Sequence, residues 1–336
     1  MATVGIIANP AAGKDIRRLV AHGRFVPNQE KVNILKRILA GLDAVGVERV
    51  VMMPDMAALG RGALDNTSFS LSVEFLEMPV FNDDLDSTRA AGMMADMEVG
   101  CLITLGGDGT NRAVAKGSRN IPLVAVSTGT NNVFPEMVEG TIAGLAAGVV
   151  ACEKVSLEDT TMAGKRLEIL VDGEMRDIAL VDVAISKERF VGSRAIWDVG
   201  TVDELFLTRA EPSSIGLSAI GAQLKPTYTC DRWGLRISLG PGGTTVSAPV
   251  APGMIEPVSI AHWSKLEYGE KADVSLNPCT VALDGERTFS ALPGQKVQVS
   301  LTDKGPPVVS IDAALKEAAR NGTFTRDAIF RGRSVS

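Results

Sequence analysis

The chain has 336 residues, of which 45% are hydrophobic and 22% charged, the composition of a globular protein with room for two domains. It carries 34 basic against 40 acidic residues, a net charge of −6, and so lacks the broad positive field of a nucleic-acid-binding protein. The longest apolar stretch, residues 141–152, is too short to span a bilayer, and the N-terminus has no basic region typical of a secretory signal. We therefore expect a cytoplasmic protein with neither a membrane nor a nucleic acid as partner.

The few histidines and cysteines exclude several kinds of enzyme. The two histidines, His22 and His262, lie in different halves of the chain and outside any motif of a triad hydrolase. The four cysteines are at least 49 residues apart, so they form neither a CxxC pair nor the short ligand spacing of a zinc site. Any chemistry is therefore expected to depend on carboxylates, backbone amides and a bound hard cation.

The first half of the chain alternates between strand and helix patterns. Short β-branched runs predict strands, and stretches with apolar residues on one face predict helices. The expected strands are 3–9, 49–53, 73–80, 101–105 and 123–127; the expected helices are one carrying Val32, Leu35, Leu39 and Leu42, one at 87–97 capped by Asp86 or Ser87, and one at 137–152. The alternation predicts an α/β nucleotide-binding domain at residues 1–152, built on a Rossmann-like, doubly wound parallel sheet.

From residue 153 the apolar residues recur with period two, and turn residues separate the runs. The expected strands are one containing Leu167, Ile169 and Val171, followed by 181–185, 235–239, 246–250, 297–301 and 308–311, with turns at 172–173 and 240–243. We therefore expect a mostly antiparallel β domain for substrate at residues 153–311. A helix at 312–321, capped by Asp312, and a tail would make up residues 312–336.

The strongest chemical signal is Gly106-Gly107-Asp108-Gly109-Thr110, which directly follows the 101–105 strand and precedes a short helix. Glycines let the backbone approach a ligand closely and point several N–H groups at one place, while the helix adds its positive N-terminal end. The loop predicts a phosphate cradle at the carboxyl end of the sheet, where open α/β sheets bind ligands. Asp108 would hold Mg²⁺ or accept a proton from a hydroxyl; the alternative is a tight turn with Asp108 as the helix cap.

Two other phosphate-binding motifs are missing. The segment 9–15, NPAAGKD, lacks the first glycine of a Walker A loop, and Asp15 stands where that loop needs Ser or Thr. No strand is followed by G-x-G-x-x-G, so a nicotinamide-dependent oxidoreductase is disfavoured.

Three segments together resemble one superfamily. They are IIANPAAGKD at 6–15, GGDGTNRAVAKG at 106–117 and STGTNNVFP at 127–135. In this order they resemble the NAD kinase and diacylglycerol/sphingosine kinase superfamily, and within it the ATP-NAD kinase-like proteins related to acetoin-catabolism protein X. The resemblance covers essentially the whole chain, including the change from α/β to β patterns near its middle, and it implies an NAD kinase-like fold.

The resemblance implies a nucleotide site on the α/β side, with Asp108 as the catalytic acid beside the acceptor hydroxyl and the metal-bound phosphates. The residues that would surround ATP are Asn9, Gly106, Gly107, Gly109, Thr110, Asn111, Gly129, Thr130, Asn131 and Asn132. Asn131 and Asn132 would equally serve as ordinary turn and capping residues. Lys14, Arg17 and Arg18 would either bring positive charge to the phosphates or form a solvated first helical turn.

On the β side the resemblance implies two more cleft acids. Asp284 and Glu286, in Leu283-Asp284-Gly285-Glu286, match the superfamily's Asp-Gly-Glu segment. Asp284 would contact the substrate, and Glu286 would be a second candidate for base or metal ligand. The same three residue types recur at 172–174, where they predict only a hairpin turn.

The acceptor site departs from the NAD kinases. Asp182 matches the acid of the Asn-Glu/Asp pair with which those enzymes contact NAD, but Val181 replaces the Asn. Their substrate-contacting TPTGSTAY segment is only faintly matched at 211–222. Because a valine makes none of the hydrogen bonds of an amide, the resemblance is weaker for NAD as acceptor than for ATP as donor.

Together these features predict an ATP-dependent small-molecule kinase that transfers the γ-phosphoryl group to a hydroxyl, with Mg²⁺ as cofactor. The 2′-hydroxyl of NAD is the leading acceptor, and an acetoin-pathway, sugar-like or lipid compound is the alternative. A different class stays open, a non-catalytic nucleotide-binding regulator that keeps the phosphate cradle. Since related kinases are dimers or tetramers, the resemblance also implies a homo-oligomer.

Overall fold

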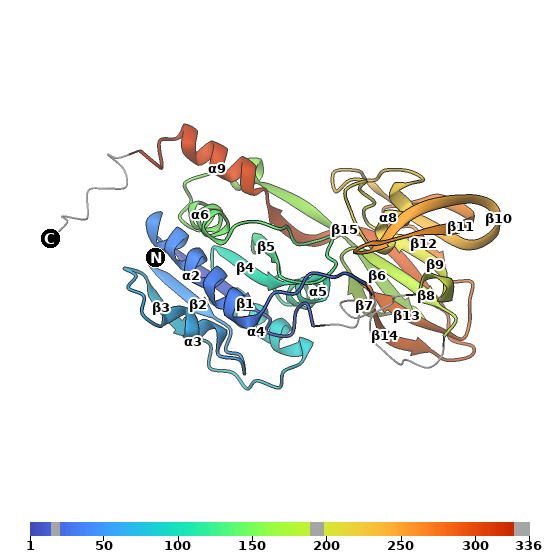
Figure 1. Cartoon of the computed structure of the whole chain (residues 1–336), viewed down its shortest axis with the longest axis horizontal. Helices are drawn as coiled ribbons and strands as arrows, with labels where there is room; N and C mark the ends of the chain where they lie inside the picture. Colours follow the sequence, from blue (N-terminus) through green and yellow to red (C-terminus); the bar gives the residue numbers. More distant parts are fainter. Residues whose placement is uncertain (15–20, 189–197, 326–336) are drawn as a thin grey trace.

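The computed structural model describes residues 1–14, 21–188 and 198–325. Figure 1 shows an α/β half, which contains the N-terminus, beside a half made almost entirely of strands. This arrangement confirms the expected fold class, an α/β domain followed by antiparallel β structure.

The α/β half is built on a parallel sheet with the strand order β3-β2-β1-β4-β5. These strands are β1 (Thr3–Ala8), β2 (Arg49–Met52), β3 (Ser72–Phe75), β4 (Cys101–Gly106) and β5 (Leu123–Ser127). The helices of this half are α2 (Asn28–Ala44), α3 (Leu59–Leu64), α4 (Asp84–Asp96), α5 (Asp108–Ala115), α6 (Gly140–Ala151) and α7 (Leu157–Thr160). Strands β1 and β4 are buried along their whole length because helices cover both faces of the sheet.

Two hydrophobic cores hold these layers together. Helices α2 and α6, joined by the C-terminal helix α9 (Ile311–Arg320), pack their apolar residues on one face of the sheet. Helices α4 and α5 pack on the other face, where their core also takes in Leu180 and Val181 from the second half of the chain. The carboxyl ends of β1, β4 and β5 therefore lie next to the β-rich half.

The second half forms a six-stranded antiparallel sheet and also extends the first sheet. The strands of the second sheet are β8 (Asp182–Ser186), β9 (Val202–Leu207), β10 (Trp233–Ala251), β11 (Met254–Glu267), β13 (Cys279–Leu283) and β14 (Glu286–Ala291). The strands added to the first sheet are β6 (Thr161–Val171), β7 (Glu174–Ala179), β12 (Lys271–Asp273) and β15 (Val297–Val309). Between β8 and β10 lie the short helices η1 (Val199–Thr201), which precedes β9, and α8 (Leu217–Ala222), which follows it.

Strand β15 connects the two halves, since it pairs in parallel with β5 at Val308 and Leu123 and antiparallel with β6. The chain therefore crosses between the halves more than once, and the domain limits at 152/153 and 311/312 stay a prediction. No helix within the described residues is both long and apolar enough to cross a membrane.

Two expected turns or breaks are absent. Residues 240–243 do not end a strand, because β10 continues through them with a register shift in which Leu239 and Thr244 both face Ile260. The glycines there, with positive φ at Gly240 and Gly242, form a bulge rather than a hairpin. Likewise, the strands expected at 297–301 and 308–311 are one strand, β15, with register shifts between them.

Several helix and strand ends also differ from expectation. Helix α4 is capped by Asp83 and not by Asp86 or Ser87, because the Asp83 carboxylate accepts the Asp86 N–H. Helix α9 is capped by Ser310 rather than Asp312. Helix α6 begins at Gly140 after its cap Glu139, later than the expected 137, and β3 ends at Phe75, well short of 80.

Candidate active site

The glycine-rich loop joins β4 to α5 and requires its glycines sterically. A Cβ on Gly107 would lie 2.8 Å from the side-chain oxygen of Asn132, and one on Gly106 would collide with Thr110. Gly107 caps α5 in an extended conformation, so Asp108 is the first helical residue. The loop thus places Asp108 and Thr110 at the carboxyl edge of the sheet, as the motif predicts.

Asp108 is held by the loop that follows β5. Its carboxylate accepts the backbone N–H of Val133 at 3.1 Å to both oxygens and that of Phe134 at 2.8 Å. The residue is buried, and Gly107 occupies the cap position, so the alternative of Asp108 as helix cap does not describe it. Two N–H donors stabilise the ionised carboxylate and fix its orientation.

The loop after β1 reaches the same place. The Asn9 amide donates to the Thr110 hydroxyl at 2.9 Å, and its oxygen accepts the N–H of Ala11. Gly13, with φ of 75°, leaves room for the carbonyl of Thr128, which would be 2.8 Å from a Cβ. The loop after β1, which carries Asn9 and Gly13, is therefore brought together with Thr110 of α5 and with Thr128 after β5.

A buried lysine, which the sequence does not reveal, holds the β1 loop. The Lys31 ammonium, on α2, donates to the carbonyls of Asn9 and Pro10 at 3.1 Å and of Ala12 at 2.9 Å. Its side chain is 0% exposed, and burial lowers the pKa of Lys31 to about 8. Lys14 is exposed, and Arg17 and Arg18 lie outside the described residues.

The third segment, residues 127–132, crosses the end of the glycine loop. Thr128 N–H donates to the Gly106 carbonyl at 3.0 Å, and the Asn132 amide donates to the Ser127 hydroxyl at 2.7 Å. Asn111, expected at the nucleotide, instead ties the loop to itself through the Thr104 hydroxyl and the Gly107 carbonyl.

Three buried oxygens in the 127–132 segment have no hydrogen-bond partner among the residues that the structure describes. They are the hydroxyls of Thr128 and Thr130 and the side-chain oxygen of Asn131. Buried polar atoms are nearly always satisfied in native proteins, so the clustering of these three oxygens beside the glycine loop indicates a ligand site.

The β half contributes two acids to the same place. Asp108, Asn131, Asp182 and Asp284 line one small pocket together with Gly216, just before α8. Asp182 is buried, and its carboxylate accepts the N–H of Gly285 at 3.2 Å. The structure therefore brings together three of the four acids that the sequence singled out, Asp108, Asp182 and Asp284.

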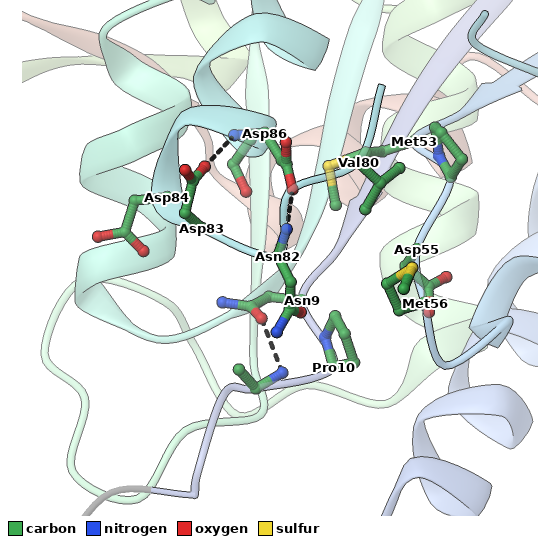
Figure 2. Close-up of a pocket in the computed structure, with 13 residues that line it drawn as sticks. Asn9, Pro10, Met53, Asp55, Met56, Val80, Asn82, Asp83, Asp84 and Asp86 are labelled. Atoms are coloured by element: carbon green, nitrogen blue, oxygen red, sulfur yellow. Dashed lines mark hydrogen bonds between the residues drawn. The ribbon is translucent and has the colours of Figure 1, made fainter. Parts of the chain in front are cut away.

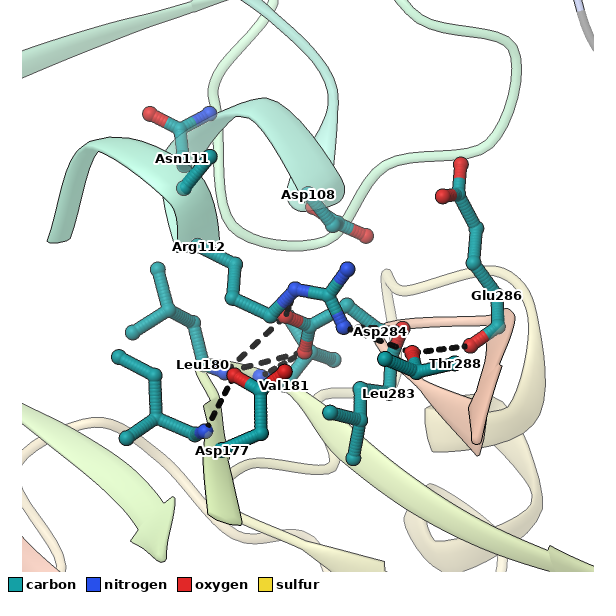
Figure 3. A network of polar contacts seen from close by, with 12 residues as sticks. Asp108, Asn111, Arg112, Asp177, Leu180, Val181, Leu283, Asp284, Glu286 and Thr288 are labelled. Carbon is teal, nitrogen blue, oxygen red and sulfur yellow. Dashed lines mark hydrogen bonds and ion pairs between the residues drawn. The ribbon is translucent and has the colours of Figure 1, made fainter. Parts of the chain in front are cut away.

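Asp284 is engaged in a network of polar contacts, most of which Figure 3 shows. Its carboxylate accepts the N–H groups of Leu180 at 3.0 Å, Val181 at 2.8 Å and Asp182 at 3.3 Å, and the Arg112 Nε lies 3.9 Å away. Burial raises the pKa of Asp284, while Arg112 and the three N–H groups oppose that rise. Asp284 thus fixes the backbone of residues 180–182, where the chain enters β8, in addition to any contact with substrate.

Side chains on one face of α5 connect the α/β half to the β half. Arg112, one turn after Asp108, donates to the Leu283 carbonyl at 3.2 Å and the Thr288 hydroxyl at 3.3 Å. Lys116, another turn on, pairs with Asp177 at 2.6 Å. Residues at i, i+4 and i+8 share a helix face, so this face fixes Asp108 relative to the β half. Nothing in the sequence marked Arg112.

Glu286, at the start of β14, lies beside the N-terminal end of α5. A Cβ on Gly109 would be 3.6 Å from its carboxylate, which projects away from the network of Arg112 and Asp284 (Figure 3). Glu286 is therefore close to the glycine loop but separate from the buried acids.

A second cleft, with a cavity volume of about 200 Å³, opens next to the β1 loop at the ends of β1 and β2 (Figure 2). Its walls include the apolar side chains of Met53, Met56 and Val80 and the amides of Asn9 and Asn82. Its acids are Asp55, Asp83, Asp84 and Asp86. Of these cleft residues only Asn9 was predicted from the sequence, because the others belong to no recognisable motif.

Mg²⁺ fits the donor set, although within the described ranges no group of three or more His, Cys, Asp or Glu side chains could hold a metal by itself. At phosphoryl-transfer sites Mg²⁺ takes one or two carboxylates and completes its shell with water and phosphate oxygens. Asp108, with Asp182 lining the same pocket, meets that requirement.

Known proteins match both halves. The model of the ATP-NAD kinase N-terminal domain matches residues 4–155, and that of the acetoin catabolism protein X C-terminal domain matches residues 165–304. Acetoin catabolism protein X of Cupriavidus necator is 41% identical over 332 residues, covering 95% of this chain and 92% of the relative. Yeast NADH kinase in complex with NADH shares the fold, with a TM-score of 0.53 at 12% identity over 100% of this chain and 90% of the enzyme. The chain therefore belongs to the acetoin catabolism protein X family, which has an NAD kinase-like fold.

Proposed function

We propose that this protein is an ATP-dependent kinase that transfers the γ-phosphoryl group of ATP to a hydroxyl of a small molecule. One observation carries the proposal: the loops after β1, β4 and β5 meet around Asp108 and Thr110, and Asp108 lines the same pocket as Asp182 and Asp284 of the β half. A phosphate cradle facing a set of carboxylates is the arrangement that phosphoryl transfer needs, because positioning and charge neutralisation supply most of its catalysis.

The cleft beside Asn9 suits the nucleoside part of ATP. Met53, Met56 and Val80 offer an apolar wall to the base, and the amides of Asn9 and Asn82 offer hydrogen bonds to the ribose. The acids of the cleft repel phosphates, so the triphosphate is directed away from it, towards the glycine loop.

In the reaction Asp108 would orient the acceptor hydroxyl and take its proton. The N–H groups of Val133 and Phe134 already fix the carboxylate, leaving it preorganised for that role. The backbone N–H groups at Gly107 and Gly109 and the hydroxyls of Thr128 and Thr130 would donate hydrogen bonds to the phosphate oxygens. Bound Mg²⁺ would supply charge neutralisation at the phosphates, with Asp108 holding it.

NAD is the acceptor that we place first. The kinase fold, the kinase named as a structural neighbour and the position of Asp182 in the pocket support it. Val181 argues for another hydroxyl compound, because its side chain is 0% exposed and packs in the core of the α/β half, where it offers no hydrogen bond. A sugar-like, acetoin-pathway or lipid acceptor is therefore the second candidate.

The proposal is tested by incubating the purified protein with Mg-ATP and either NAD or NADH and measuring NADP(H). We expect product with the wild-type chain and none with Asp108→Asn. ADP formed only when another metabolite is added would keep the kinase and reject NAD. Binding of ATP without consumption, across a broad metabolite pool, would favour the nucleotide-binding regulator and contradict the proposed activity.

A further inference from the structure

Arg209, two residues after β9, is a cation without a polar partner among the residues that the structure describes. Within residues 1–14, 21–188 and 198–325 its guanidinium makes no hydrogen bond and no ion pair, and its Nε is buried without a partner. Its close contact is the Phe134 ring, whose centroid is 5.3 Å from the guanidinium carbon. The guanidinium therefore lies over the Phe134 ring, and among the described residues its N–H donors have no partner.

Phe134 places Arg209 beside the proposed catalytic site. The Phe134 N–H is one of the two groups that hold the Asp108 carboxylate, at 2.8 Å. The backbone before Arg209 is anchored as well, because Thr208 binds the Val181 carbonyl through its N–H at 2.9 Å and the Leu180 carbonyl through its hydroxyl at 2.7 Å. The backbone N–H groups of Leu180 and Val181 in turn bind the Asp284 carboxylate, as Figure 3 shows.

Two of the four carboxylates near Arg209, those of Asp108 and Asp284, already have other partners. Glu211, Asp108, Asp284 and Glu136 attract the guanidinium at longer range, and burial lowers the pKa of Arg209 against this attraction. Asp284 pairs with Arg112 and three N–H groups, and Asp108 accepts two. The other cations of the site are committed too, Arg112 to the β13–β14 turn and Lys31 to the β1 loop.

Arg209 is half-buried, and a guanidinium N–H that is shielded from water without a hydrogen bond costs free energy unless a ligand compensates for it. Its planar fork matches the oxygens of a phosphate, and stacking on an aromatic ring fixes the direction of the fork. Building on the proposed kinase function, we propose that Arg209 binds a phosphate oxyanion of the ligand that enters the cleft beside Asp108. That oxyanion belongs either to the triphosphate of ATP or to a phosphate-bearing acceptor.

The test compares Arg209→Gln with wild type by calorimetry, using Mg-ATP, inorganic tripolyphosphate, NAD and adenosine as separate probes. We expect affinity to fall about tenfold or more for the probe whose phosphate Arg209 holds, while adenosine affinity is unchanged. If the variant binds Mg-ATP and tripolyphosphate more weakly, Arg209 holds a phosphate of the donor ATP. If it binds only NAD more weakly, Arg209 holds a phosphate of the acceptor. Arg209→Lys, which keeps the charge but not the fork, should lie between the two.

Arg232→Gln is the matched control, because its guanidinium also lies over an aromatic ring, Tyr268, at 5.9 Å but in the β half. We expect it to bind every probe like the wild type. The Tm of Arg209→Gln should stay within about 2 °C of wild type, since no hydrogen bond within the protein is lost. Unchanged affinity for all probes would overturn the inference, as would a parallel loss of adenosine binding and Tm, which indicates a structural arginine. If the wild type binds no phosphate probe, the proposed function fails as well.

Discussion

The two sides of the proposed site are built differently. On the phosphate side the loops after β1, β4 and β5 present backbone amides and small side chains, and several buried oxygens there have no partner within the part of the chain that the structure describes. On the acceptor side the buried carboxylates are already occupied, Asp284 by three N–H groups and Arg112, and Asp182 by Gly285. The phosphate side is thus prepared for a ligand, whereas much of the acceptor side maintains its own geometry.

The difference explains why ATP is a firmer expectation than the acceptor. A glycine-rich cradle needs certain residues at fixed positions, and it keeps them whichever hydroxyl receives the phosphoryl group. The acceptor contacts depend on side chains that vary with the substrate, and Val181 shows that they vary here. The following predictions probe each side separately.

The largest effect is expected on the phosphate side, from Asp108→Asn. We expect ATP turnover to fall about 100- to 10,000-fold, because an amide neither takes the hydroxyl proton nor carries charge. Asp312→Asn, in the first turn of α9, is the control and should leave turnover unchanged. Steady-state ADP production measures both, and full activity in Asp108→Asn would contradict the proposed role.

On the acceptor side, Arg112→Met should destabilise the fold by about 3–5 kcal/mol, because it leaves the Asp284 charge buried without a cation. Lys116→Met, on the same face of α5, breaks a partly exposed ion pair and should cost less than about 1 kcal/mol. Adding Asp284→Asn to Arg112→Met should restore part of the loss. Urea unfolding gives the free energy of unfolding of each variant. Equal losses for Arg112→Met and Lys116→Met would contradict a structural role for the contacts between Arg112 and Asp284.

The fold and the grouping of the glycine-loop residues could largely be predicted from the sequence, whereas the network around Arg112 and Asp284 could not. The strand and helix patterns gave the doubly wound sheet, and sterically required glycines marked the cradle. Arg112 and Leu283 are 171 residues apart in the sequence, and no local sequence pattern predicts a contact at that separation. Lys31 was similarly hidden, since a lysine within an amphipathic helix normally faces water. The hairpin turn expected at residues 240–243 was wrong because β-bulges and hairpin turns favour the same residue types, glycine above all.

A smaller effect on the phosphate side comes from Gly129→Ala. Its Cβ would lie 2.5 Å from the Asn132 amide, so we expect a loss of Mg-ATP affinity and about 1–3 kcal/mol of stability. Gly92→Ala is the control: it lies inside α4 with nothing within 4 Å of a Cβ, and alanine there should add about 0.5–1 kcal/mol. Calorimetry and thermal unfolding distinguish the two; wild-type ATP affinity in Gly129→Ala would exclude this segment from the cradle.

The smallest effect is a pH dependence from Lys31. Its pKa in the fold is about 8, below the usual value for lysine, so the unfolded chain binds more protons above pH 8. The free energy of unfolding therefore gains a contribution from Lys31 as pH rises from about 8 to 10, by at most about 1.4 kcal/mol per pH unit. Lys31→Met should lose this rise and Lys36→Met, on the same helix, should keep it. Equal slopes in all three proteins would show that Lys31 titrates normally.

The most direct test of the central claim follows the phosphoryl group itself. ATP labelled in its γ-phosphate is incubated with Mg²⁺, the protein and a pool of hydroxyl metabolites that includes NAD, and labelled products are separated. We predict a labelled organic phosphate that forms with the wild-type chain and is absent with Asp108→Asn. Label that stays in ATP under every condition, from a protein that binds ATP normally, would contradict the account.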